Sequence, residues 1–183
     1  MIEVRVNGIF LTQSQASGII LKEKEGNRTL PIVIGEYEAQ SIALALEDLK
    51  PPRPITHDLT VNLLESIGVT IESVIISELK ENTYYAIIRI QKDMETMEID
   101  ARPSDAIALA VRLGTNIFVN ETVMDQAAYI PEDKETDDKN YLFKSATDNL
   151  EELKEQLKNA VDNEEYEKAA KIRDQIKKLE SGS

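Results

Sequence analysis

Three short stretches of the sequence place ionisable side chains at the start of a segment with helical spacing. Leu30 to Leu46 reads LPIVIGEYEAQSIALAL, Arg53 to Leu59 reads RPITHDL, and Ala101 to Gly114 reads ARPSDAIALAVRLG. Together they contain carboxylates, arginines and the single histidine of the chain. Such groups can transfer protons, coordinate a hard divalent ion through oxygen and hold a phosphate by charge. The stretches are therefore candidates for a site that acts on a phosphodiester.

A structural role explains the same residues without any chemistry. Ser, Thr and Asp at the start of a helix satisfy free backbone N–H groups, and carboxylates there suit the helix dipole. Asp105 fits this explanation best, and His57 fits it as a cap or as a hydrogen-bonding group of the core. Spacing along the chain does not show whether these groups converge in space.

Composition excludes several functional classes. The chain has 183 residues, of which 42% are hydrophobic and 30% charged, which is typical of a globular protein. It has no Cys, which excludes disulfides, thiolate zinc sites and cysteine nucleophiles. The net charge of −13 argues against nonspecific binding of a polyanion. Phosphate-loop, dinucleotide-binding and zincin motifs are absent, so no organic cofactor is expected.

The sequence favours a cytoplasmic protein that does not enter a membrane. The opening MIEVRVNGIF has no basic region followed by an apolar one, as a secretory leader would. No apolar run approaches the roughly 20 residues that a membrane-spanning helix needs.

Hydrophobic periodicity predicts alternating strands and helices up to about residue 128. Polar turns and a change of period after Gly35 mark the boundaries, Pro51 and Pro52 stop one helix, and Gly114 caps another. The predicted strands cover 4–10, 18–24, 28–34, 69–77, 83–91, 97–101 and 117–119, and the predicted helices 39–49, 58–67, 103–113 and 121–128. This order indicates an α+β fold, with a mixed or antiparallel sheet and packed helices.

The remainder of the chain has a different composition. Residues 131–146 are dense in charge and lack periodicity, which indicates an acidic linker. Residues 147–180 carry Leu, Ala and Ile at helical spacing in two segments separated by Asp162 to Glu164, which predicts an antiparallel α-helical hairpin. We therefore predict a domain over 1–130, a linker over 131–146 and a hairpin over 147–180.

The three stretches, taken in order, resemble the bifunctional nuclease domain family over about Met1 to Ala128. The resemblance implies an α+β domain that forms homo-oligomers through residues 1–130, and a nuclease activity on DNA and RNA claimed for plant members. Carried over residue by residue, its motif positions in this sequence are Glu38, Arg53, His57, Asp58, Arg102, Ser104 and Asp105. From the chemistry of these side chains we further predict catalytic roles for Glu38, His57, Asp58 and Asp105, substrate binding by Arg53, Arg102 and Ser104, and Mg²⁺ or Mn²⁺ held by Glu38 and Asp58.

A second resemblance concerns the C-terminal hairpin. Glu165 to Leu179, EYEKAAKIRDQIKKL, resembles the UVR motif, the helical hairpin found in DNA-repair proteins of the excinuclease B and C types. The motif implies association with a protein partner through residues 147–180 and carries no catalytic group.

Two functions are compatible with these observations. The first is a metal-assisted nuclease of DNA or RNA joined to an interaction hairpin. The second is a non-catalytic oligomeric scaffold or regulator that recruits a protein partner through the UVR hairpin. The acidic net charge favours the second, whereas Arg53, Arg102 and Arg112 offer the first a local positive patch. The nuclease interpretation expects the four predicted catalytic residues to line one cleft.

Overall fold

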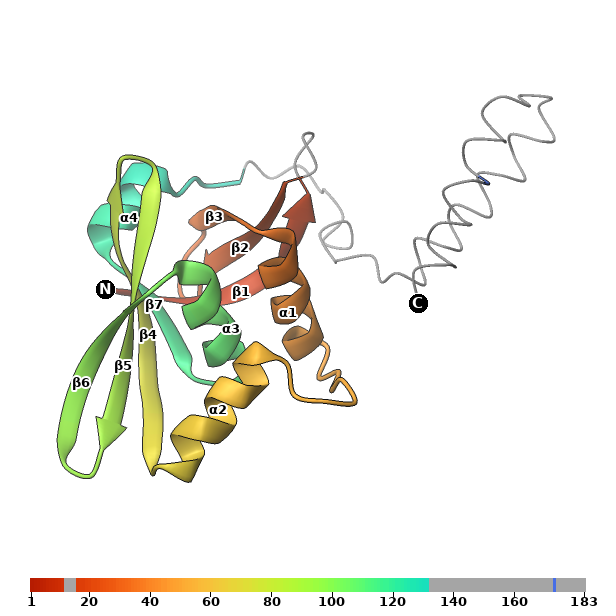
Figure 1. Cartoon of the computed structure of the whole chain (residues 1–183). Coiled ribbons are helices and arrows are strands. Elements are labelled where there is room, and N and C mark those ends of the chain that lie inside the picture. Colours follow the sequence, from red (N-terminus) through yellow and green to blue (C-terminus); the bar gives the residue numbers. More distant parts are fainter. Residues whose placement is uncertain (12–15, 132–172, 174–183) are drawn as a thin grey trace. The chain divides into compact units, whose positions relative to one another are not determined.

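The computed structural model describes residues 1–11, 16–131 and 173. Within residues 1–11 and 16–131, one seven-stranded sheet carries four helices (Figure 1). The strands are β1 (Ile2–Leu11), β2 (Ser17–Glu23), β3 (Thr29–Ile34), β4 (Val69–Lys80), β5 (Thr83–Lys92), β6 (Glu95–Ala101) and β7 (Asn116–Val119), and the helices are α1 (Glu36–Leu46), α2 (Thr56–Ser66), α3 (Pro103–Leu113) and α4 (Glu121–Ala127). The predicted linker and hairpin lie outside the described residues, apart from Pro131 and Arg173.

Two antiparallel meanders form the sheet, and one short strand joins them. The strand order is β3-β2-β1-β7-β4-β5-β6. Strand β7 pairs antiparallel with β1 and parallel with β4, and every other named pair is antiparallel. The sequence-based expectation of a mixed sheet with packed helices is confirmed for this part of the chain.

Small side chains bring α1 and α3 close together over the sheet. Ala39 and Ala43 of α1 are buried, as are Ala106 and Ala110 of α3, and the two helices contact each other. Alanine lets helix backbones approach closely. The predicted apolar face of the first helix extended to Leu49, but α1 ends at Leu46, and the side chains of both leucines are largely exposed.

Helix α2 is attached differently, because none of its residues is buried. The i, i+4, i+8 spacing that predicts this helix is formed by Leu59, Leu63 and Ile67, and all three side chains are more than half exposed. The helix exists, but the apolar spacing does not mark a covered face. Gly68 and Gly114 follow α2 and α3 with φ of 69° and 65°, the left-handed conformation that glycine adopts most easily.

Candidate functional site

The first turns of three helices meet at one cavity. Glu38 lies in the first turn of α1, His57 in that of α2 and Asp105 in that of α3, and Arg102 immediately precedes α3. These four side chains line a cavity of about 440 Å³ together with Tyr37, Gln40, Ser41, Leu44, Ile55 and Thr56. Residues from three distant stretches of the sequence therefore face one space.

Local backbone geometry explains why each polar side chain occupies a helix start. Gly35, Ile55 and Arg102 hold extended backbone just before α1, α2 and α3. Pro103 occupies the first position of α3, where its missing N–H costs nothing. Carboxylates in first turns are stabilised by the positive end of the helix dipole. Both carboxylates and the partly positive starts of three helices therefore lie around the cavity.

Arg102 links the carboxylates of two helices. Its Nε and Nη2 donate to Oδ2 and Oδ1 of Asp105 at 2.7 and 3.0 Å, and its Nη1 lies 3.0 Å from Oε1 of Glu38. The arginine side chain is 65% exposed, against 33% for Asp105 and 22% for Glu38. Arg102 is therefore a guanidinium at the cavity mouth that an incoming anion can reach.

The pKa of Asp105 lies below its ordinary value. Burial alone would raise this pKa, but the hydrogen bonds from Arg102, the charge of Arg102 and the hydrogen bond with His57 together outweigh burial. Asp105 is accordingly ionised at neutral pH.

Both ring nitrogens of His57 have partners. Nδ1 lies 2.8 Å from Oγ of Ser41, and Nε2 lies 3.3 Å from Oδ1 of Asp105. The imidazole is only 15% exposed, and Ser41 is buried. The ring is therefore held in a fixed orientation, with one edge toward Asp105.

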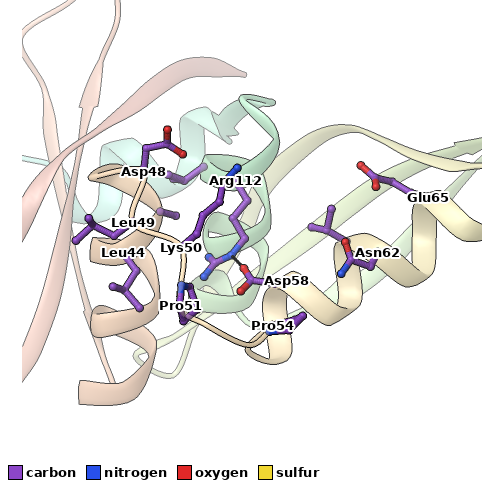
Figure 2. Close-up of a pocket in the computed structure, with 13 residues that line it drawn as sticks. Leu44, Asp48, Leu49, Lys50, Pro51, Pro54, Asp58, Asn62, Glu65 and Arg112 are labelled. Carbon is purple, nitrogen blue, oxygen red and sulfur yellow. Dashed lines mark hydrogen bonds and ion pairs between the residues drawn. The ribbon is translucent and has the colours of Figure 1, made fainter.

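Asp58 belongs to a different cavity. Its Oδ1 accepts from Nε of Arg112 at 2.7 Å, and its Oδ2 accepts from the backbone N–H of Ile55 at 3.1 Å. Both charged residues line a cavity of about 570 Å³ between α1 and α2 (Figure 2), whereas neither lines the cavity of His57. The nuclease interpretation expected four carboxylate and imidazole groups in one cleft, and three of them share it.

The pKa of Asp58 is also lowered. Burial acts to raise it, but the hydrogen bond from Arg112, the N–H of Ile55 and the nearby positive charge outweigh burial. Because Asp58 caps the start of α2 and pairs with Arg112, its structural role is supported directly by the geometry.

The residues predicted to hold Mg²⁺ or Mn²⁺ do not form a common site. Glu38 and Asp58 line different cavities, and each carboxylate is paired with a guanidinium. Within residues 1–11 and 16–131, no three His, Asp or Glu side chains are grouped closely enough to hold a metal ion. This donor set does not fit a ready-made divalent-cation site, because hard cations bind several carboxylate oxygens at once.

The three residues predicted to bind substrate do not all line the cavity of His57. Ser104 is buried and lines a neighbouring cavity of about 290 Å³, together with Glu38 and Arg102. Arg53 is exposed in the segment before α2 and does not line the cavity of His57. Of the three, Arg102 alone lies beside His57.

Sequence reasoning missed Ser41 and assigned Arg112 only a general positive charge. The signal for Ser41 was its position three residues after Glu38 and directly before the apolar run from Ile42 to Leu46. A hydroxyl on a buried helix face requires a hydrogen-bond partner. Oγ of Ser41 has two such partners, Nδ1 of His57 and Nη2 of Arg112, the latter at 3.0 Å.

Comparison with known proteins identifies the family. The bifunctional nuclease domain matches residues 19–132, and the UvrB/uvrC motif matches residues 147–182. The chain belongs to the bifunctional nuclease domain family and carries a UVR motif. Both resemblances inferred from the sequence are thereby confirmed.

Relatives occur in bacteria and plants. An uncharacterized protein of Mycobacterium tuberculosis is 39% identical over 156 residues, which cover 85% of this chain and 92% of the relative. Bifunctional nuclease 1 of Oryza sativa subsp. indica is 31% identical over 109 residues, 57% of this chain and 33% of the rice protein. Bifunctional nuclease 2 of Arabidopsis thaliana is 26% identical over 186 residues, 90% of this chain and 56% of the relative.

The helices within the described ranges are short, and the longest have 11 residues. None of them is long and apolar enough to cross a membrane.

Proposed function

We propose that this protein hydrolyses phosphodiester bonds of nucleic acid at the cavity lined by Glu38, His57, Arg102 and Asp105. The observation that supports the proposal is the convergence of these four side chains, which come from three separate stretches, at three helix starts. Membership of the bifunctional nuclease domain family supports the same reaction class. Helix starts favour bound anions, and Arg102 adds an accessible positive charge.

Each side chain has a role in this proposal. Arg102 exchanges its contacts with Glu38 and Asp105 for the phosphate, which frees the Glu38 carboxylate. Glu38 then takes a proton from the water that attacks phosphorus and returns it to the leaving oxygen, so that the P–O bond breaks without net proton change. An N–H of the His57 ring donates a hydrogen bond to a phosphate oxygen that gains charge. Before the phosphate binds, Asp105 orients the ring.

The requirement for Mg²⁺ or Mn²⁺ stays a prediction, and no step above depends on a metal. A cation recruited by the substrate phosphate would reach the Glu38 carboxylate only after Arg102 had left it. Measuring cleavage with Mg²⁺, with Mn²⁺ and with EDTA shows whether the reaction requires a cation. Undiminished cleavage in EDTA would refute the cation requirement and leave the proposed roles of the side chains intact.

The experiment compares cleavage of plasmid DNA and of a structured RNA by the wild type, His57→Asn, Glu38→Gln and Asp100→Asn. Asp100 is an exposed carboxylate of β6 and does not line the cavity, so it serves as the matched control. We expect the first two variants to lose at least about 100-fold in rate, the size of effect that a general base and a hydrogen-bond donor to the transition state each contribute, and the control to match the wild type. Equal cleavage by all four proteins would reveal a contaminating nuclease and refute the proposal.

A second function is favoured by the charge balance of the site and by the UVR motif. Glu38, Asp58 and Asp105 are all paired with arginines, as in a purely structural network. We propose that residues 147–182, matched by the UVR motif, recruit a protein partner that offers a second helical hairpin. Calorimetric titration of the full chain with a peptide of residues 147–180 tests this, and Ile176→Asp should abolish the binding heat. Binding without any nuclease activity would favour the scaffold.

A further inference from the structure

We propose that Arg112 is a positioning residue that fixes the tautomer of the His57 ring, acting through the hydroxyl of Ser41. The tautomer it selects carries the proton on Nε2, the nitrogen that faces Asp105 and the cavity. This inference rests on the proposed function for its chemical purpose, because that function needs a ring N–H directed toward the substrate phosphate.

The direction of each hydrogen bond follows from which atoms can donate. Nη2 of Arg112 lies 3.0 Å from Oγ of Ser41, and a guanidinium has donors but no acceptor. Oγ therefore accepts from Arg112, and its own proton is left for Nδ1 of His57 at 2.8 Å. With Arg112 on one lone pair of Oγ, this arrangement favours an unprotonated Nδ1. In the neutral ring the proton sits on Nε2, where it is directed at Oδ1 of Asp105, 3.3 Å away.

Arg112 is itself held on every side. Its Nε donates to Asp58 at 2.7 Å, its Nη1 to the carbonyl oxygen of Ala108 at 2.9 Å, and its Nη2 also to the carbonyl oxygen of Ser41 at 3.1 Å. The side chain is 10% exposed. Figure 2 shows the guanidinium directed at Asp58, and both residues line the larger cavity. Only the planar fork of arginine makes these contacts together, since a lysine offers a single nitrogen.

Two independent partners thus favour the same tautomer. Asp105 accepts from Nε2, and the Ser41 hydroxyl, oriented by Arg112, donates to Nδ1. Yet Asp105 is already engaged by two nitrogens of Arg102. When a substrate phosphate takes Arg102 away, Asp105 becomes free to turn, and the Arg112–Ser41 pair then holds the ring alone. The experiment must therefore remove Asp105 to expose the contribution of Arg112.

The single histidine of the chain makes this measurable without an activity assay. Long-range ¹H–¹⁵N spectra of the full protein, labelled with ¹⁵N-histidine and recorded at a pH of about 8.5, report which ring nitrogen carries the proton. We expect the Nε2–H form in the wild type and in Asp105→Ala. Adding Arg112→Met or Ser41→Ala to Asp105→Ala should shift the tautomer ratio about five-fold toward Nδ1–H, the change that one hydrogen bond contributes.

Controls separate positioning from general damage. Arg89→Met removes a surface arginine paired with Glu98 and should leave the ring signals unchanged in the Asp105→Ala background. Arg112→Lys, which keeps the charge, should behave like Arg112→Met. Because Ser41→Ala removes a single oxygen, it reports the tautomer even where the larger change impairs folding, which circular dichroism monitors.

Two results would overturn the inference: an Nδ1–H ring in the wild type, or an unchanged ratio when Ser41→Ala or Arg112→Met is added in folded Asp105→Ala protein. Neither depends on cleavage. A tautomer shift in a protein that cleaves nothing would refute the proposed function and support the positioning role. Loss of cleavage in His57→Asn, together with an unchanged tautomer ratio in the Ser41 and Arg112 variants, would support the proposed function and refute the positioning role.

Discussion

Gly35 lies directly under the carboxylate of Glu38 at the start of α1. A Cβ atom built on Gly35 would collide with Oε2 of Glu38, although the φ of −70° at this position suits any residue. The absence of a side chain here therefore lets the carboxylate fold back toward Arg102. A methyl group at this position would displace the Glu38 carboxylate and leave the glutamate itself unchanged.

We predict that Gly35→Ala lowers nuclease activity about 10- to 100-fold while leaving the melting temperature nearly unchanged. A misplacement of about 1 Å in an active site costs up to about 100-fold in rate. Initial rates of plasmid cleavage by Gly35→Ala, Asp100→Asn and the wild type provide the measurement. Full activity of Gly35→Ala would mean that the position of Glu38 is unimportant for the reaction.

Asp58 and Asp105 make the fold sensitive to acid. Their pKa values are lower in the folded protein than in the unfolded chain, where an Asp titrates near 3.9. As the pH falls, the unfolded chain therefore binds protons first, and the stabilisation present at neutral pH is lost on the way through the folded pKa values. The free energy of unfolding should decrease steadily below a pH of about 5.

We predict that Asp58→Asn is less stable than the wild type at neutral pH but loses less stability between a pH of about 5 and about 3. Urea unfolding at a series of pH values measures both quantities. Asp100→Asn changes an exposed carboxylate that makes no side-chain hydrogen bond in the described part of the chain. Its free energy of unfolding should therefore depend on pH in the same way as that of the wild type. Parallel curves for Asp58→Asn as well would show that this ion pair adds no pH-dependent stability.

At the level of elements, α2 is held to the fold by polar contacts more than by burial. The links are the Asp58–Arg112 ion pair and the hydrogen bonds of His57, while no residue of the helix is buried. By contrast, seven of the eleven residues of α3 are buried. Elements with few buried contacts open locally at the lowest free energy.

Hydrogen exchange should therefore show α2 opening before α3. We predict faster amide exchange in residues 60–66 than in residues 107–113, and a further acceleration confined to α2 in Asp58→Asn. Exchange measured by mass spectrometry on the full chain resolves the two helices. Uniform protection of both helices, or an acceleration spread over the sheet, would contradict this view of α2.

The elements themselves were largely predictable, because strand alternation and helical spacing are local properties. Gly114 and the Pro103 start placed α3 correctly at both ends. The face that α2 presents was not predictable, since Leu59 and Leu63 have the spacing of a buried stripe and yet are exposed. Which side of a helix is covered depends on the order of the strands in the sheet, and a local sequence pattern does not reveal that order.

The candidate site was predictable in part for the same reason. The helix starts that carry Glu38, His57 and Asp105 are visible in the sequence, but their convergence depends on α1, α2 and α3 sharing one region of the sheet. Asp58 immediately follows His57, and a helix turns by about 100° per residue, so the two side chains face different cavities. Adjacent residues with similar chemistry thus acquire different surroundings.

For the whole molecule, the division of the chain can be tested directly. We predict that limited proteolysis cuts first within Glu132 to Lys144, because the hydrophobic periodicities of the first domain are complete before Pro131 and this segment is dense in charge. Mass spectrometry of the early fragments gives the sites. A first cut within α3 or β7 would place the boundary elsewhere.

We also predict that the protein is at least a dimer through residues 1–130. Strand β6 ends the sheet, and its Met97 and Ile99 are 39% and 46% exposed. An edge strand with exposed apolar side chains is suited to pairing with another chain. Light scattering should show an oligomer for the wild type and for Asp100→Asn, and a monomer for Ile99→Asp. A monomeric wild type would refute the prediction, and an oligomeric Ile99→Asp would move the contact away from β6.

The place of β7 in the sheet has a consequence for how the protein is made. During synthesis, β1–β2–β3 and β4–β5–β6 can each form from neighbouring hairpins, but the inner edges of β1 and β4 stay open until residues 116–119 have left the ribosome. Closing that gap requires contacts between segments more than 100 residues apart, such as Ile2 with Val119, which is slow. The nascent chain therefore passes through a stage with two open strand edges, when its exposure to chaperones and to aggregation is greatest.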